Sequence, residues 1–307
     1  MYMKTNTIVS ILVGLIILGG LFYYFKKSDT LPFGSVTTNQ QSATTPATTT
    51  VKTIPVVDKT KTVIGTSVQN RAITAYHFGT GAKEILFVGG IHGGYSWNTS
   101  LLAYELMDYL RANPNAVPSN VTVTVIPVLN PDGLSKVVSV DGRFTKADVS
   151  PVESVKVSGR FNANNVDLSR NFDCNWKAVG VWQTKPVSGG TAVFSEPESL
   201  AIKNYVDTHT VVGAVIWYSA AGGVYASRCN DVTLAQTMAI TELYAKASTY
   251  PAHESYDFYE TTGDMVNWLA SKSIPAISVL LTTHEATEWS KNLSGVKSLL
   301  TYYATQK

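Results

Sequence analysis

The sequence predicts an α/β protein in which helices cover both faces of a mostly parallel sheet. From residue 62 onward, short runs rich in branched apolar residues alternate with segments whose apolar residues recur at helical spacing. This alternation is typical of strand–helix–strand units. The turn signal Asn130-Pro131-Asp132-Gly133 directly follows one of the runs. In such sheets, sites form beyond the carboxyl ends of strands. We therefore expect the functional residues in the loops after Val88, Val128, Ile216 and Leu281.

The expected strands share a high content of Val, Ile, Leu and aromatic residues, which suit a pleated, buried surface. The central strands are nearly continuous apolar runs, as strands buried on both faces are. The strands are Val63–Val68, Ala72–Phe78, Ile85–Val88, Val121–Val128, Val211–Ser219 and Ile274–Leu281.

The expected helices have apolar residues three and four positions apart. In the first helix, Leu102, Leu106 and Leu110 form one stripe. The second helix begins with Ser195 as an N-cap and has Glu198 three residues later, which is the pattern of a capping box. The helices span Thr99–Arg111, Ser195–His209, Thr233–Ser248, Thr261–Ser273 and Asn292–Gln306.

The amino-terminal segment predicts a membrane anchor that is separate from the fold. Ile8–Phe25 is 18 residues long and carries no charge, close to the ~20 residues that span a bilayer as a helix. No convincing cleavage site follows it, so we expect an uncleaved transmembrane helix within residues 1–27. A buried core helix is the alternative, but the run is apolar on all faces. Lys4 flanks one side, and Lys26 and Lys27 flank the other, so charge does not decide the orientation.

Residues 28–61 predict a flexible linker between this anchor and a folded domain at 62–307. The linker is rich in Thr, Ser and Gln and poor in large apolar residues, so it cannot bury a core. The chain has 307 residues, of which 45% are hydrophobic, enough for one large domain. Its net charge is +2 and it has no basic block, so nothing indicates a nucleic-acid partner.

Cys174 and Cys229 are the two cysteines of the chain. An even count in a chain with an export-type anchor permits one disulfide. Two buried free thiols are the alternative, and the spacing alone does not decide between them.

Seven segments occur in an order that resembles the zinc carboxypeptidase family, the metallopeptidases like carboxypeptidase A. They are GGIHGGYSWNT, LNPDG, GRFNANNVDLSRNFDCNW, FSEPES, HTVVGAVIWYSAAGGVYAS, YETTGDMVNWLA and IPAISVLLTTHEATEW. The specific part is VDLSRNF followed by SEPE at this distance, and the resemblance covers about Ile64 to the end of the chain. It implies an eight-stranded mixed sheet between helices, with one zinc ion at the carboxyl edge of the sheet.

The resemblance also implies a mechanism. In the family, two histidines and one glutamate hold zinc and leave a position for water. The metal activates this water and polarises the scissile carbonyl, and another glutamate takes the water's proton. An arginine stabilises the oxyanion, an Asn-Arg pair binds the terminal carboxylate of the substrate, and a mobile tyrosine closes over the substrate.

At the positions of the family's three metal ligands, this sequence keeps only one ligand residue. His92 corresponds to the first zinc histidine, but Tyr218 stands where the second is expected. The glutamate ligand falls on Tyr95 or Ser96, and Ser96 is the better match because Trp97 follows it. Neither residue is a carboxylate. We therefore expect His92 to be a hydrogen-bonded histidine at a strand end, and we expect no tightly bound cofactor.

The position of the catalytic glutamate is occupied by Leu280, which cannot act as a base. Asp264, near the specificity pocket, either selects basic side chains or caps its helix. The remaining substrate positions are Ser169 and Arg170 at the Asn-Arg pair, Arg160 or alternatively Arg143 at the oxyanion arginine, Tyr259 at the mobile tyrosine, and Val266 beside Asp264.

The other histidines do not offer an obvious replacement ligand. His284 is nearest to Leu280, but with Glu285 it belongs to a run that the resemblance makes structural. His209 ends a helix and is expected at the opposite edge of the sheet. Tyr218 could bind zinc only as a phenolate, and the pKa of a free phenol is about 10.

In the family fold, the loops after Arg170 and Tyr218 converge on the cleft, which favours a Cys174–Cys229 disulfide and an extracytoplasmic domain. We expect a membrane-anchored, non-catalytic carboxypeptidase-like domain that retains weak binding of peptide or protein carboxyl ends. Two alternatives stay open. One is an active zinc carboxypeptidase that uses unusual ligands, and the other is a purely structural surface domain.

Overall fold

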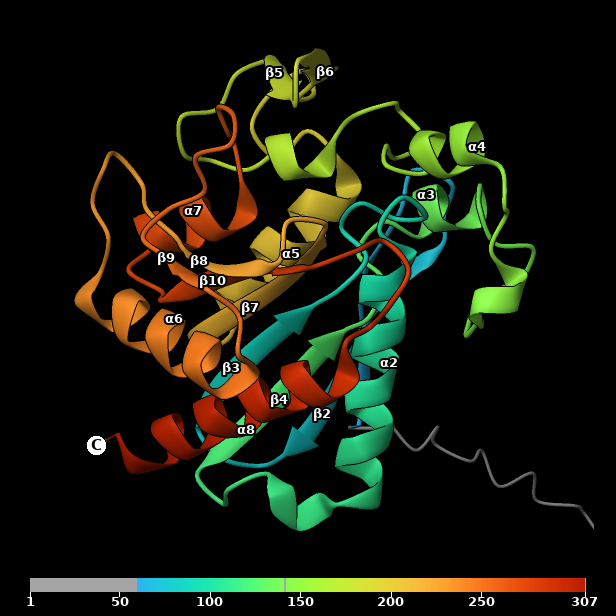
Figure 1. The fold of residues 1–307 in the computed structure, drawn as a ribbon. Coiled ribbons are helices and arrows are strands. Elements are labelled where there is room, and N and C mark those ends of the chain that lie inside the picture. The colour runs from blue at the N-terminus through green and yellow to red at the C-terminus, as the bar shows by residue number, and fades with distance from the viewer. Residues whose placement is uncertain (1–59, 141, 307) are drawn as a thin grey trace, which may run out of the picture. The chain divides into compact units, whose positions relative to one another are not determined.

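The structure, a computed structural model, describes residues 60–140 and 142–306 (Figure 1). The predicted anchor at 1–27 and nearly all of the predicted linker at 28–61 lie outside the described residues. Within the described ranges, no helix is both long enough and apolar enough to cross a membrane.

The centre of the fold is an eight-stranded mixed sheet, which confirms the expected architecture. In chain order its strands are β1 (Lys61–Thr66), β2 (Ala72–Gly79), β3 (Lys83–Val88), β4 (Val121–Ile126), β7 (Val211–Ser219), β8 (Gly223–Ala226), β9 (Ala252–His253) and β10 (Ala276–Leu281). Across the sheet they lie in the order β1-β2-β4-β3-β7-β10-β8-β9 (Figure 1). The pairs β1–β2, β2–β4 and β8–β10 are antiparallel, and the other neighbours are parallel.

Helices and short connecting elements make up the rest of the described chain. The α-helices are α2 (Trp97–Ala112), α3 (Pro131–Ser135), α4 (Glu153–Ser158), α5 (Pro197–Thr208), α6 (Ala235–Ser248), α7 (Met265–Ser271) and α8 (Trp289–Thr305). A small hairpin consists of β5 (Val179–Trp182) and β6 (Lys185–Ser188), and single 3-10 turns occur at η1 (Pro114–Ala116), η2 (Lys146–Asp148) and η3 (Leu168–Arg170).

The helices cover both faces of the sheet because successive strand residues point to opposite sides. In β3, Ile85 and Phe87 pack with apolar side chains of α2, α6 and α8. Leu86 and Val88, between and beyond them, pack with those of α5 and α7. Burial on both faces explains why the central strands are nearly continuous apolar runs.

Two expectations about local structure differ from the observed fold. The helix α5 begins at Pro197, with Glu196 at its N-cap, and no side chain caps it. Proline suits the first helical position, where an N–H has no intrahelical partner. Ser195 instead donates a hydrogen bond to the Glu196 carboxylate at 2.8 Å, so the predicted capping box with Glu198 is wrong. The strands β8 and β9 and the β5–β6 hairpin were not predicted, because runs of two to four residues carry too little pattern.

Candidate functional site

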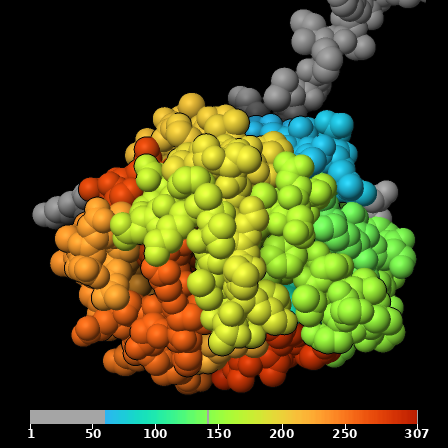
Figure 2. Space-filling model, turned by 90° about the horizontal axis from the view of Figure 1, so that it is seen from above, coloured from blue at the N-terminus to red at the C-terminus, as the bar shows by residue number. Residues whose placement is uncertain are grey.

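A cleft of about 630 Å³ opens beyond the carboxyl ends of β3, β7 and β10. In the view from above, the yellow-green and orange segments, far apart in the sequence, lie side by side on this face (Figure 2). The side chains of Lys177 and Glu260, 2.6 Å apart, form a salt bridge between these segments. Residues predicted for the site that line the cleft are His92, Tyr95, Arg160, Ser169, Arg170, Tyr218, Tyr259, Asp264, Val266 and Leu280.

Two of the residues considered for the site do not line the cleft. Arg143, the second candidate for the oxyanion arginine, is half-exposed and pairs with Asp108 at 2.8 Å. Ser96 is buried at the N-cap of α2, and its hydroxyl has no hydrogen-bond partner among the described residues. Of the two candidates for the glutamate position, Tyr95 is therefore the one whose side chain can reach the cleft.

Asp167 lies at the centre of a buried network below the cleft. Its Oδ2 accepts a hydrogen bond from Arg160 Nε at 2.8 Å, and its Oδ1 accepts one from Ser169 Oγ at 2.8 Å. His92 joins the network through Nε2, 3.0 Å from Ser169 Oγ, and through Nδ1, 3.2 Å from Arg160 Nη1. Burial opposes the ionisation of Asp167, but Arg160 and His92 outweigh it and hold the pKa of Asp167 well below its usual range.

These contacts leave His92 without a free lone pair. A guanidinium can only donate, so Nδ1 must accept from Arg160 and Nε2 must carry the ring hydrogen. Ser169 Oγ donates to Asp167, so it can accept from Nε2. Burial first, and then the Arg160 cation, lowers the pKa of His92 to about 4, so the ring is neutral near pH 7. A metal would have to displace Arg160 to reach the one lone pair of the neutral ring.

Arg170 is the second buried cation of the cleft and is 2% exposed. Its Nη1 donates to the carbonyl oxygen and the hydroxyl of Ser169, at 2.7 and 2.9 Å. Its Nε and Nη2 both donate to the Val181 carbonyl, at 3.2 and 2.9 Å. Burial lowers the pKa of Arg170, but nearby Asp167 and other groups raise it by more. Among the salt bridges of the described residues, none involves Arg170.

Tyr218, which the sequence resemblance aligns with the second metal histidine, donates its phenol hydrogen to Asp264 Oδ2 at 3.2 Å. Burial, and then Asp264, raises the pKa of Tyr218 well above its ordinary value, so the side chain remains a phenol. Asp264 is also the N-cap of α7, because its Oδ1 accepts from the Val266 N–H at 3.0 Å. The capping interpretation of Asp264 is therefore confirmed. Burial raises the pKa of this carboxyl.

Leu280 lies directly opposite Tyr218 in the register of β10 and β7. It is 7% exposed and packs in the apolar cluster that also contains Ile216. Tyr259, on the segment before α7, is half-buried, and its ring centroid is 5.9 Å from the Arg170 guanidinium carbon. At the floor of the cleft, the sheet thus presents an apolar side chain and a phenol, at the two positions that the sequence resemblance assigns to a base and an imidazole.

Two residues that shape the cleft were not singled out from the sequence. Asp167 neutralises Arg160, and its place within the VDLSRNF motif was a signal that could have identified it. Trp182, in the β5–β6 hairpin, packs against the Arg160 guanidinium at 4.5 Å and against the Tyr95 ring at 5.1 Å. It belongs to no recognisable motif, so its role emerges only from the fold.

Of the remaining histidines, His284 has a buried Nδ1 without a hydrogen-bond partner among the described residues, and the other three contact neighbouring side chains. His284 is the one that lines the cleft, where its ring packs 4.4 Å from that of Tyr95 and burial lowers its pKa. The others are held by neighbouring side chains: His77 by Thr62 and Thr124, His209 by Tyr205, and His253 by Tyr225.

The residues present do not fit the zinc ion that the resemblance implies. Zinc sites in proteins use thiolate, imidazole and carboxylate ligands, three or four of them together. Here Tyr95 and Tyr218 offer phenols, Ser96 offers a buried hydroxyl, and the lone pair of His92 accepts from an arginine. Within the described ranges, no group of three or more His, Cys, Asp or Glu residues is arranged to hold a metal ion.

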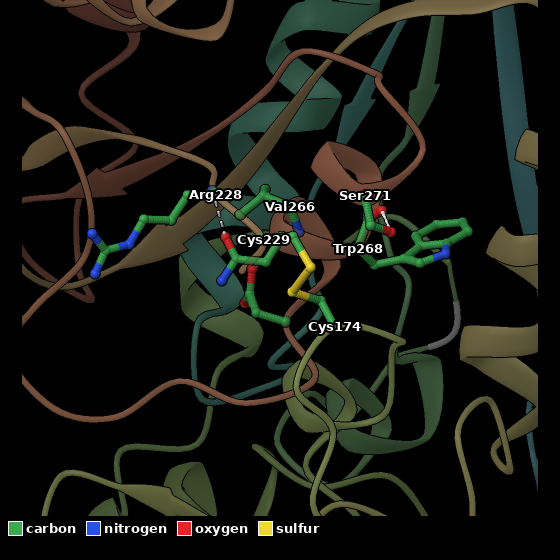
Figure 3. The surroundings of a disulfide bond; sticks show 8 residues. Cys174, Arg228, Cys229, Val266, Trp268 and Ser271 are labelled. Atoms are coloured by element: carbon green, nitrogen blue, oxygen red, sulfur yellow. Dashed lines mark hydrogen bonds between the residues drawn. A yellow bond between two sulfur atoms is a disulfide. The ribbon is translucent and has the colours of Figure 1, made fainter. Parts of the chain in front are cut away.

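Cys174 and Cys229 form a disulfide, which confirms the predicted pairing. The bond lies beside α7, close to Val266 (Figure 3). It joins the segment that follows Arg170 to the segment that follows β8, and both segments supply residues that line the cleft, such as Asn175. The disulfide therefore ties two parts of the cleft wall together.

Comparison with known proteins agrees with this architecture. The family model described as zinc carboxypeptidase matches residues 56–288. The chain therefore belongs to the zinc carboxypeptidase family, whose activity depends on zinc.

Individual relatives match parts of the chain. Human carboxypeptidase D is 28% identical over 138 residues, which are 43% of this chain and 8% of that protein. Mouse carboxypeptidase M is 27% identical over 162 residues, 48% of this chain and 31% of that protein. The match thus spans less than a third of either relative. Bovine thrombin-activatable fibrinolysis inhibitor, solved with tick carboxypeptidase inhibitor, has a similar fold, with a TM-score of 0.62, 16% identity and coverage of 79% of this chain and 89% of that one.

Proposed function

We propose that this chain is a non-catalytic carboxypeptidase-like domain that binds peptide or protein carboxyl ends. The observation that carries the proposal is the closed network around His92, in which Arg160 and Ser169 engage both ring nitrogens. A metallocarboxypeptidase needs a metal to activate water and a base to take the water's proton. Tyr218 and Leu280 stand at positions where the family places a metal ligand and that base.

The contact between His92 and Ser169 does not supply a serine nucleophile in place of the metal. A histidine base takes the serine proton on a free ring lone pair. The lone pair of His92 faces Arg160 instead, and the Ser169 hydroxyl donates to Asp167. The pKa of Asp167 is held well below its usual range, so this carboxylate is a weak base for the serine.

Binding, unlike hydrolysis, needs only groups that the cleft retains. Arg170 is a fixed cation without a salt-bridge partner among the described residues, and Tyr259 lies beside it. A hydrogen bond to a charged group contributes about 1.5–3 kcal/mol, but the lost motion of the ligand offsets much of this. Ser169 is also shorter than the asparagine of the family's pair. We therefore expect micromolar to millimolar affinity.

The proposed location is outside the cytoplasm, on a single amino-terminal membrane helix. The apolar run Ile8–Phe25 supports the anchor. The Cys174–Cys229 disulfide supports an oxidising compartment. Protease added to sealed membrane vesicles of known sidedness should remove the domain from the extracytoplasmic face, and protection from that face would contradict the proposal.

Two measurements on the purified full chain test the proposed function. Metal analysis after dialysis against a mild chelator should find far less than one zinc per chain, whereas one zinc per chain would favour the active-enzyme alternative. Titration with matched peptides should show tighter binding of the free acid than of the carboxyl-terminal amide. Arg170→Ala should remove this difference, and Arg143→Ala, outside the cleft, should preserve it. Equal binding of both peptides by the wild-type chain would favour the structural-domain alternative.

A further inference from the structure

Thr262 contributes an unpartnered hydroxyl to the wall of the cleft. The residue is 3% exposed and lines the cleft, and its Oγ1 has no hydrogen-bond partner among the described residues. A buried hydroxyl without a partner is unfavourable, and such groups are uncommon in folded proteins. In a polar cleft, an acceptor from a ligand or a water normally satisfies such a group.

The Thr262 hydroxyl lies close to the stem of Arg170. Both lie next to Gly180. A Cβ atom added to this glycine would be 2.9 Å from Arg170 Cδ and 3.3 Å from Thr262 Oγ1. Arg170 and Thr262 are therefore neighbours, and both line the cleft.

The contacts of Arg170 leave it short of donors for a ligand. A guanidinium has five N–H groups, and the contacts to Ser169 and Val181 account for four of them. One N–H, on Nη2, remains. A carboxylate has two oxygens, so a second donor must come from another group.

We infer that Thr262 and Arg170 together form an oxyanion subsite, in which the Thr262 hydroxyl donates to one oxygen of a ligand carboxylate and Arg170 Nη2 donates to the other. The inference rests on the proposed function and defines its ligand class, a peptide end with two acceptor oxygens. An amidated end has one carbonyl oxygen and an NH₂ group, so it can accept from only one of the two donors. Thr262 therefore contributes to the discrimination between free acid and amide.

The test compares Thr262→Val with Thr262→Ser in the full chain, using the same peptide as free acid and as amide. Valine keeps the size of threonine but lacks the hydroxyl, whereas serine keeps the hydroxyl. The matched control is Thr237→Val in α6, because the Thr237 hydroxyl is also buried without a partner but lies away from the cleft.

We expect Thr262→Val to weaken free-acid binding by about tenfold or more, equivalent to about 1.4 kcal/mol. Thr262→Ser should stay within about threefold of the wild type, and Thr237→Val should bind unchanged. The thermal midpoint should not fall in either valine variant, because each loses an unpaired buried hydroxyl.

Different failures identify different errors. If the wild-type chain binds acid and amide equally, the proposed function fails and the inference fails with it. If Arg170→Ala removes the acid preference but Thr262→Val retains it, the proposed function stands and the Thr262 inference is overturned. A lowered thermal midpoint for Thr262→Val alone would mean that the hydroxyl has a structural partner, which also overturns the inference.

Discussion

Arg160 donates a hydrogen bond from Nη1 to Nδ1 of His92 at 3.2 Å, so an arginine occupies the lone pair that a metal ligand would need. The arrangement is self-consistent because Asp167 neutralises the arginine at 2.8 Å and also accepts from Ser169. Leu280, which the sequence resemblance aligns with the catalytic glutamate, adds an apolar side chain to the floor of the cleft. The buried network around Asp167 therefore stabilises the fold, and its contribution to the free energy of unfolding can be measured.

The first prediction concerns the pH dependence of stability. The pKa of His92 falls from 6.5 in the unfolded chain to about 4 in the fold, mainly because of burial. Between these two pH values, the unfolded chain binds more protons at His92 than the folded chain does. The free energy of unfolding is therefore highest above pH 6.5 and decreases as the pH falls toward 4. His92→Gln can still accept from Arg160 and donate to Ser169, but it does not titrate. From pH 7 to 4, the wild type should lose about 3 kcal/mol more of its free energy of unfolding than this variant.

Urea unfolding at several pH values provides this measurement. The lowered pKa of Asp167 changes the free energy of unfolding mainly below pH 4, outside the range over which the wild type and His92→Gln are compared. His77 and His284, whose pKa values are also lowered by burial, contribute equally to both proteins. Parallel pH curves for wild type and His92→Gln would show that His92 titrates normally and that the closed network does not exist.

The second prediction compares a buried and an exposed ion pair. Arg160→Leu leaves the carboxylate of Asp167 buried and unpaired, which should cost about 3–5 kcal/mol of unfolding free energy. Arg143→Ala removes the exposed partner of Asp108 and should cost less than about 1 kcal/mol. Adding Asp167→Asn to Arg160→Leu should recover part of the loss, because the buried charge is then absent. Equal losses in the two single variants would contradict the assigned burial of the network.

The third prediction concerns the disulfide. Cys174 and Cys229 are 55 positions apart, and closing a loop of this length stabilises a fold by about 4 kcal/mol in the chain-entropy account. The double variant Cys174→Ser with Cys229→Ser should lose roughly that amount in urea unfolding. It should also bind free-acid peptides more weakly, because both tied segments line the cleft. Thiol labelling of unreduced, denatured wild-type chain should find no reactive thiol, and two reactive thiols would disprove the bond.

The extent to which the fold could be predicted depends on the length of each pattern. The sheet from β3 to β10 is readable because its strands are long apolar runs separated by amphipathic helices. The strands β8 and β9 and the β5–β6 hairpin were missed, because pairing with distant residues stabilises them and their own pattern is short. The start of α5 was misplaced because Pro197 had more influence than the capping preference of Ser195.

Some residues of the candidate site could likewise be predicted from the sequence, whereas others could not. The order of the motifs was enough to single out His92, Tyr218 and Leu280, and the fold brings all three to one cleft. The role of Asp167 depends on cations and a histidine that separate loops bring together, so spacing along the chain could not predict it. The choice between Tyr95 and Ser96 depends on where α2 begins, and helix ends are the least certain feature of a sequence pattern.

The last prediction is that the lost groups, and not the scaffold, account for the proposed inactivity. Ser169→Asn, Tyr218→His and Leu280→Glu, combined with Tyr95→Glu, should give a chain that holds about one zinc and cleaves carboxyl-terminal residues slowly. The same three changes with Ser96→Glu should hold little zinc, because Ser96 does not line the cleft. Subsets should give almost nothing, since groups that act as a unit are strongly non-additive. Metal analysis and a carboxypeptidase assay, with circular dichroism to verify folding, make the measurement. If both sets fold but neither holds zinc, the assigned metal positions are wrong; if the Ser96→Glu set alone binds zinc, α2 must begin later than Trp97.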